Sequence, residues 1–295
     1  MNHTTKGMIL MLIAVLIIPI TDGIAKYLTS YISVLQIVWL RSILQALILG
    51  FILYFGKKSF AKFDTIYIYL GLTLSACMFF LFWGLEFLPM ANNIALFFVE
   101  PFILTILSVL FLKEKLTKAI LITLIIGFIG TLIVIRPNWS AYGIAAVFPV
   151  LAGFFYALYL LILRISSNQN RGVIQTQFYI GLVSTVIFTL VLFFGLFTEV
   201  KVMKIIPVSF DLWGFILALG VITSFAHYII AKAFSYTKPS ILASFQYIEI
   251  ISATILGAIF FHEFPDTLTV LGAGIVVIAG VNLIYFERKQ HIIDT

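Results

Sequence analysis

The chain of 295 residues is 62% hydrophobic and 10% charged, with a mean hydropathy of +1.16. Soluble domains carry about 25% charged residues, so a water-soluble fold would have no place to bury this much apolar surface. The apolar residues form continuous runs rather than a strict alternation, which favours membrane-spanning helices over a β-barrel. The net charge of +6 is therefore interpreted as a membrane-topology signal, and no nucleic-acid partner is expected.

Ten apolar stretches predict an all-α membrane protein with ten transmembrane helices. They cover roughly residues 7–28, 33–55, 65–86, 90–112, 119–136, 142–163, 174–197, 211–235, 239–261 and 268–286. The first stretch is followed by Lys26 rather than by a small-residue cleavage site, so it is interpreted as a retained span. Cys77 is the one cysteine, which excludes a disulfide within the chain.

The basic residues indicate how the spans are oriented. With the N-terminus in the cytoplasm, 12 of the 18 lysines and arginines fall on the cytoplasmic side and 3 on the outer side. The remaining three, Lys26, Arg41 and Lys232, lie within spans. Cytoplasmic loops are enriched in lysine and arginine, so both termini are predicted to be cytoplasmic, in a bacterial inner membrane.

The predicted fourth and ninth spans carry the same arrangement of acids. Glu100 and Glu114 are 14 residues apart, as are Glu249 and Glu263, and the two pairs are offset by 149 residues. The chain is therefore predicted to contain two five-helix repeats, residues 1–137 and 138–295. Because five is an odd number, the second repeat must be inverted in the membrane, and inverted repeats place a transport site between the two halves.

Glu100 and Glu249 are expected near the middle of the membrane, 11 residues after Pro89 and ten after Pro239. An ionised carboxylate there needs a partner, a wet cavity or a proton. A substrate counter-ion or a proton-coupling site is one interpretation, and a structural acid that ties two helices together is the other. Pro101 removes a backbone donor and can bend the helix beside Glu100.

Asp22 and Lys26 have the i, i+4 spacing of a helical ion pair. They form either a local pair near the outer interface, with Lys26 reaching toward water, or a pair that Pro19 exposes to a cavity. Arg41 is expected to need an anionic partner, with Asp22 and Glu100 as candidates. Alternatively, its guanidinium binds a substrate carboxylate through two hydrogen bonds.

Further polar and aromatic residues are candidates for the same site. His227 is either a proton relay or an ordinary interior histidine. Aromatic and amide side chains that we expect to line the substrate path are Trp39, Phe98, Tyr156, Tyr247, Asn93 and Gln246. Acids at span ends, Glu86, Glu114, Glu263 and Asp266, are candidates for gate contacts. No catalytic constellation, metal-ligand spacing or P-loop is present in the sequence, so no cofactor is expected.

The chain resembles the EamA family of the drug/metabolite transporter superfamily. The resemblance is carried by the run from Ala91 to Phe111-Leu112-Lys113-Glu114 and by its twin that ends in Phe260-Phe261-His262-Glu263. The pattern of Asp22, Lys26 and Arg41 is similar to that of members that carry S-adenosylmethionine, whereas Val99-Glu100-Pro101 is similar to other metabolite carriers, including vitamin carriers. The resemblance implies a central cavity built from spans one to four and six to nine, with spans five and ten at the periphery.

These observations together predict a secondary transporter, not an enzyme, that works by alternating access. Its substrate would be a small polar or zwitterionic metabolite, such as an amino acid derivative, an S-adenosylmethionine-like compound or another nitrogenous metabolite. Proton coupling or exchange, the direction of transport and a homodimer formed through the Gly-rich fifth and tenth spans remain open. The alternative is a membrane-embedded lipid-handling protein or enzyme, for which the sequence shows no nucleophile or metal constellation.

Overall fold

A computed structural model describes residues 3–56, 62–135, 143–169, 171–198 and 200–262, together with 264, 267, 268, 270–272, 274, 275 and 278. The described residues form helices and connecting turns, with no strand among them. In the first half of the chain the helices are α1 His3–Thr29, α2 Val34–Phe55, α3 Ile66–Phe87, α4 Met90–Phe97, α5 Glu100–Leu112 and α6 Lys118–Ile135. In the second half they are η1 Gly143–Ala146, α8 Val147–Asn168, α9 Val173–Gly195, η2 Lys201–Met203, η3 Phe210–Leu212, α10 Trp213–Tyr236, α11 Pro239–Gln246 and α12 Glu249–Phe261.

Within this part of the chain, seven helical segments are long and apolar enough to cross a membrane. They correspond to the predicted spans one to four and six to eight. The predicted fifth span is α6, with a shorter apolar stretch over Ile120–Gly130, and the ninth is divided between α11 and α12. Most of the tenth lies outside the described residues. The protein is therefore a multi-pass helical membrane protein, and the number of ten spans stays a prediction.

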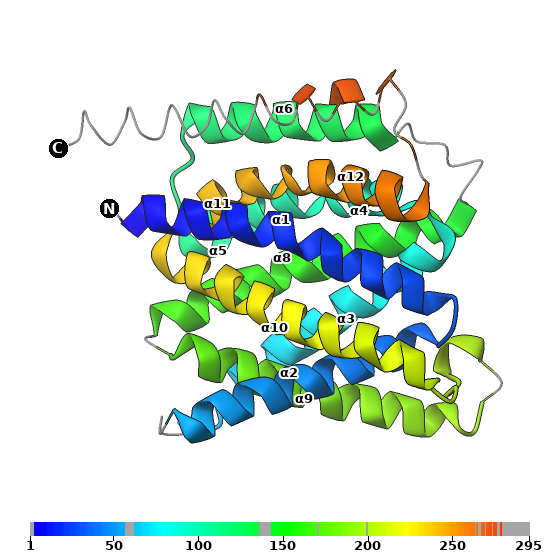
Figure 1. The fold of residues 1–295 in the computed structure, drawn as a ribbon. Coiled ribbons are helices and arrows are strands. Elements are labelled where there is room, and N and C mark those ends of the chain that lie inside the picture. Colours follow the sequence, from blue (N-terminus) through cyan, green and yellow to red (C-terminus); the bar gives the residue numbers. More distant parts are fainter. Residues whose placement is uncertain are drawn as a thin grey trace.

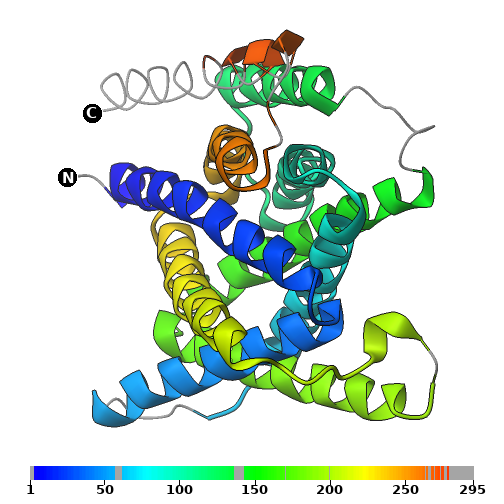
Figure 2. The same ribbon diagram turned by 45° about the vertical axis from the view of Figure 1, so that its right-hand side comes forward.

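The helices of the two halves pack in corresponding pairs. α1 packs along α10 and α3 packs along α8, while α2 lies on α9 (Figure 1). α5 contacts α8, and its equivalent α12 contacts α1. In the same way, α4 contacts α12 and α5 contacts α11. Each contact between two helices thus recurs between the two equivalent helices of the other half. Figures 1 and 2 place α2 and α9 at one end of the array and α6 at the other.

The two predicted acid-bearing spans are interrupted directly before Glu100 and Glu249, respectively. The first breaks at Phe98 and Val99, so that Glu100 begins α5, and the second breaks at Tyr247 and Ile248, so that Glu249 begins α12. Each glutamate is thus the first residue of a helix, where the positive end of the helix dipole favours a negative charge. The sequence predicted a bend only near Glu100.

Pro101 explains only the first of these two breaks. It lacks the N–H that would continue the hydrogen-bond ladder, but the equivalent residue of the second repeat is Ile250, whose N–H bonds to the carbonyl of Tyr247 at 3.3 Å. Phe98 and Tyr247, which occupy equivalent positions in the two breaks, pack edge to face with ring centroids 5.5 Å apart. Contact between the two broken helices therefore accompanies both interruptions.

Gly153 of α8 lies against the first break. Substitution of this glycine tests how tightly α8 packs against the backbone of the break. A Cβ atom at this position would lie 2.5 Å from the carbonyl oxygen of Phe97 and 3.0 Å from Val99 Cγ1. Gly153→Ala is expected to lower the free energy of unfolding by about 1–3 kcal/mol, because backbone must move to admit the methyl group. Thermal unfolding in detergent measures the effect.

Gly214→Ala is the matched control, because nothing lies within 4 Å of a Cβ at Gly214 in α10. Alanine is a better helix former than glycine, so this control variant is expected to be neutral or slightly stabilised. Equal unfolding temperatures for the two variants would contradict tight packing of α8 against the break.

Candidate functional site

A small cavity lies where α1, α2, α3, α4, α8, α10 and α12 meet, between the two halves of the chain. Its volume is about 30 Å³, which is room for about two water molecules. The polar side chains that line it are Thr21, Asp22, Arg41, Tyr156, Thr223, His227 and Glu249. Apolar side chains, among them Leu81, Phe82 and Phe97, complete the wall.

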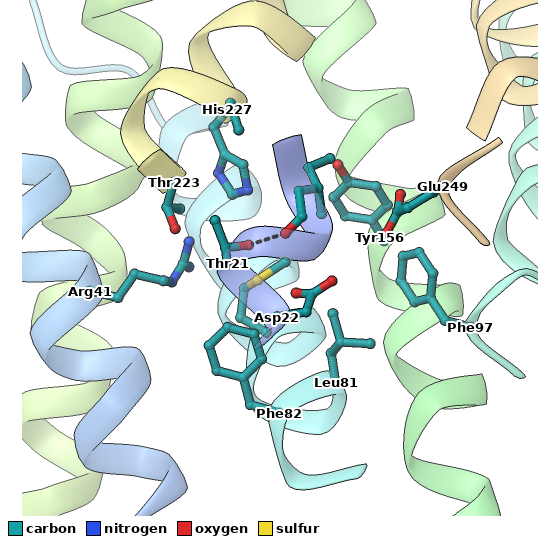
Figure 3. A pocket seen from close by; sticks show the side chains of 13 residues that line it. Thr21, Asp22, Arg41, Leu81, Phe82, Phe97, Tyr156, Thr223, His227 and Glu249 are labelled. Atoms are coloured by element: carbon teal, nitrogen blue, oxygen red, sulfur yellow. Dashed lines mark hydrogen bonds between the residues drawn. The ribbon is translucent and has the colours of Figure 1, made fainter. Parts of the chain in front are cut away.

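Groups of opposite charge face each other across this cavity. Figure 3 shows Arg41, Thr223 and His227 on one side, Tyr156 and Glu249 on the other, and Asp22 between them. Asp22, Arg41 and Glu249 are only 2%, 1% and 4% exposed. Charged side chains are rare inside membrane-spanning helices and usually mark a substrate or ion pathway.

Several of these polar groups have no hydrogen-bond partner among the described residues. The unpartnered atoms are Asp22 Oδ2, Arg41 Nε and one terminal nitrogen of Arg41, Thr223 Oγ1 and His227 Nδ1. Buried polar atoms almost always have a partner, and each exception requires an explanation. The exceptions here come from α1, α2 and α10 and gather around one cavity. This arrangement is typical of a site that receives a polar ligand.

Asp22 and Lys26, which the sequence offered as a local ion pair, have different surroundings. Asp22 lies at the cavity, whereas Lys26 Nζ contacts the carbonyl oxygen of Leu88 at 3.5 Å and lies 4.9 Å from the ring centroid of Phe261. No ion pair of Arg41 with Asp22 or Glu100 occurs within the described part of the chain, although Arg41 and Asp22 line the same cavity.

Glu100 and Glu249 have different surroundings although they are equivalent in the sequence. Glu100 is fully buried, and its Oε1 accepts a hydrogen bond from Gln246 Nε2 at 3.4 Å, while Oε2 has no partner among the described residues. Gln246 lies 149 residues after Phe97, which lines the cavity as Glu249 does. Where the second half has Gln246, the first half has Phe97. Glu100 is therefore bonded to an amide, whereas Glu249 has no equivalent amide and faces the cavity.

Five predicted lining residues lie away from the cavity, and Gln246, which bonds to Glu100, is one of them. Trp39 donates its indole N–H to a threonine of α9 at 2.8 Å, and Asn93 donates to the carbonyl oxygen of Leu81 at 3.1 Å. Phe98 packs on Tyr247. Tyr247 in turn lies against α6, where a Cβ atom at the facing glycine would meet its ring at 2.6 Å. Of the predicted aromatic lining residues, Tyr156 lines the cavity.

The sequence interpretation missed Thr21, Thr223 and Phe97. Helical spacing contains the signal for two of them, since Thr21 adjoins Asp22 and Thr223 lies four residues before His227, on the same face of α10. Phe97 carries no comparable signal. It becomes recognisable only through the repeat, as the equivalent of Gln246.

One predicted gate acid makes a contact between the two halves. Glu114, just after α5, accepts a hydrogen bond from the backbone N–H of Ser240 at the start of α11, at 3.3 Å. Glu86 is exposed at the end of α3. The other two gate candidates, Glu263 and Asp266, lie outside the described residues. No group of three or more possible metal ligands occurs in the part of the chain that the structure describes.

Two related helical halves with a polar, partly charged cavity between them define the class of membrane transport proteins that move small solutes. The family comparison agrees with this class. The chain belongs to the EamA-like transporter family, whose profile matches residues 5–136 and again residues 143–286. The family lies in the drug/metabolite transporter superfamily, so the protein is a transporter and not an enzyme.

Curated relatives have several different substrates. The chain is 26% identical to the S-adenosylmethionine uptake transporter of Rickettsia prowazekii over 98% of this chain and 97% of that protein. It is 24% identical to the pseudopaline exporter CntI of Pseudomonas aeruginosa (94% and 95% covered) and 27% identical to the riboflavin transporter of Vibrio cholerae (70% and 67% covered). A solved crystal structure with 14% identity matches 97% of this chain and 99% of its own with a TM-score of 0.78, which supports the fold alone.

Proposed function

We propose that this protein is a secondary active transporter that moves a small polar or zwitterionic nitrogenous metabolite across a bacterial inner membrane by alternating access. Amino acid derivatives and S-adenosylmethionine-like compounds are the first candidates. The proposal includes ten spans in two inverted repeats, residues 1–137 and 138–295, with both termini in the cytoplasm. The paired packing of the two halves and the bias of lysine and arginine support this topology.

The observation that carries the proposal is the convergence of unpartnered polar atoms on a cavity between the two halves. Asp22, Glu100 and Glu249 are three buried acids, whereas Arg41 is the one buried guanidinium beside the cavity. Buried charges require compensation. A ligand with a cationic amine and an anionic group would supply it, with the amine near Asp22 and Glu249 and the anionic group at Arg41. Protons on the acids would supply part of it in the ligand-free state.

The size of the cavity supports a conformational cycle. Pockets for small molecules have volumes of about 300–1,000 Å³, whereas this cavity measures about 30 Å³. The described conformation is therefore closed around the site, and its helices must separate to admit a metabolite. The broken helices α4–α5 and α11–α12 are candidates for the moving parts, because an interrupted helix needs few backbone changes to bend.

The remaining site residues receive secondary roles in this proposal. Tyr156 and His227 orient the ligand or relay protons at the cavity. Gln246 holds Glu100, which couples protons or gates the site, and Lys26 acts as a gating contact through Phe261 of α12. Trp39, Asn93, Phe98 and Tyr247 shape the surrounding helices rather than touch the substrate.

The test combines binding and transport. Purified protein is screened by thermal unfolding against amino acids, quaternary amines, nucleosides, S-adenosylmethionine, flavins and organic acids, at two pH values. A ligand that binds the folded state alone raises stability by RT ln(1 + [L]/Kd), about 2.7 kcal/mol at 100 times Kd. A stabilising compound is then tested for counterflow in proteoliposomes. Stabilisation and counterflow by a nitrogenous metabolite are expected. No response at either pH would contradict the proposal and favour the lipid-handling alternative.

A further inference from the structure

A second cavity, of about 340 Å³, lies at the end of the helix array that holds the beginning of α1. Thr237, just before α11, marks that end, because its hydroxyl donates to the carbonyl oxygen of Thr4 at 3.2 Å. The cavity forms where the C-termini of α5 and α8 meet the N-terminus of α11, so both halves of the chain contribute. Its polar lining residues are Lys113, Glu114, Lys115, Arg164, Asn168 and Lys238.

Positive charge dominates this second cavity. Four of its lining residues are cations and one is an acid, for a net charge of +3. The acid, Glu114, already accepts a hydrogen bond from the backbone of α11. Arg164 is held in place because its guanidinium donates to the carbonyl oxygen of Phe234 at 2.5 Å. Lys113, Lys115 and Lys238 are exposed, and none forms an ion pair with an acid in the described part of the chain.

The convergence of these cations exceeds what membrane topology requires. Topology depends on the number of lysines and arginines near span ends and not on their meeting in one cavity. A cation that serves topology can be neutralised by a nearby acid. Arg171, at the same end of α8, is an example, because it pairs with Asp64 before α3. The pKa of Asp64 is held below its usual range by the backbone N–H of Ile66 and then by Arg171. The cavity lacks such a compensating acid for its lysines.

We propose that this second cavity binds a phosphate group. Phosphate offers several acceptor oxygens and up to two negative charges, which suits a cluster of ammonium groups beside one guanidinium. The headgroup of an anionic phospholipid and a soluble phosphate ester are both sources of this chemistry. The position at the ends of membrane-spanning helices gives either of them access. Occupancy would tie the ends of α5, α8 and α11 together and hold this side of the molecule closed.

The experiment compares two double variants that remove the same charge from exposed lysines. K113Q/K238Q changes the cavity, and K62Q/K118Q removes two lysines outside it that precede α3 and begin α6. Thermal unfolding in neutral detergent is followed while phosphatidylglycerol, phosphatidylcholine or inorganic phosphate is added at constant ionic strength. Circular dichroism and gel filtration confirm that each variant is folded.

Phosphatidylglycerol or inorganic phosphate is expected to raise Tm in the native protein and in K62Q/K118Q. In K113Q/K238Q the apparent Kd is expected to rise about tenfold or more, since each lysine near such a group contributes about a factor of five. A response to phosphatidylglycerol alone identifies the lipid as the source, and a response to inorganic phosphate alone identifies a soluble ester. Absence of both responses, or equal weakening in the two double variants, would overturn the proposal.

Discussion

Glu100→Gln is expected to abolish transport while leaving the protein folded and inserted in the membrane. Glutamine has nearly the same shape and retains an oxygen that can accept the hydrogen bond from Gln246. It loses the negative charge and the exchangeable proton. Without that charge or proton the coupled cycle cannot be completed, so the transport rate should fall by a factor of about 100 or more. Counterflow in proteoliposomes measures the loss.

Glu249→Gln and Glu86→Gln complete this experiment. Glu249 faces the cavity directly, so its variant should also lose substrate binding, seen as the loss of the ligand-induced rise in Tm. Glu86 is exposed at the end of α3, and its variant should transport at the native rate. A native transport rate in the Glu100→Gln variant would contradict a coupling or gating role for this carboxylate.

Arg41→Met is expected to separate stability from function. The guanidinium is 1% exposed, and two of its nitrogens have no partner among the described residues. Burying such a charge costs several kcal/mol, and methionine fills much of the same space without that cost. The variant should therefore unfold at a temperature no lower than the native protein, yet lose transport by a factor of about 100 or more, because nothing remains to hold the anionic group of the substrate.

Lys232→Met is the matched control for Arg41→Met. Lys232 is also a cation within a helix, but it lies over the ring of Tyr236, 5.2 Å from the centroid, and does not line the cavity. Its loss should change transport by less than about twofold, since an exposed cation–π contact contributes only about 0.5–1 kcal/mol to stability. A marked drop in Tm for Arg41→Met with normal transport would show that Arg41 is structural.

The repeat was the part of the fold that the sequence predicted most specifically. The offset of 149 residues, found from four glutamates, also relates Phe98 to Tyr247 and the two breaks in the acid-bearing spans. It extends to the helix ends, where Lys113 and His262 both adopt left-handed backbone with φ of 53° and 57°. Such conformations are uncommon outside glycine, so their recurrence shows that the two halves share backbone geometry and not only composition.

The composition of the site could be predicted only in part. Asp22, Arg41, His227 and Glu249 are conspicuous because a charged or titratable residue stands out in an apolar helix. The position of Trp39 away from the cavity could not be predicted, because an aromatic residue near a charge carries no information about which side of its helix faces the interior. The different surroundings of Asp22 and Lys26 were also beyond the sequence, since i, i+4 spacing does not determine what each side chain contacts.

The unequal surroundings of the two glutamates have an energetic consequence. In a transporter that alternates between two inverted halves, perfect symmetry would relate the inward-open and outward-open states by a two-fold rotation and give them equal free energy. Gln246 beside Glu100 and Phe97 beside the cavity remove that degeneracy. A gap of only about 1.4 kcal/mol gives a tenfold excess of one state over the other. Under the alternating-access proposal, Gln246 and Phe97 set the resting bias of the cycle, and exchanging the two side chains would shift the resting population toward the opposite side of the membrane.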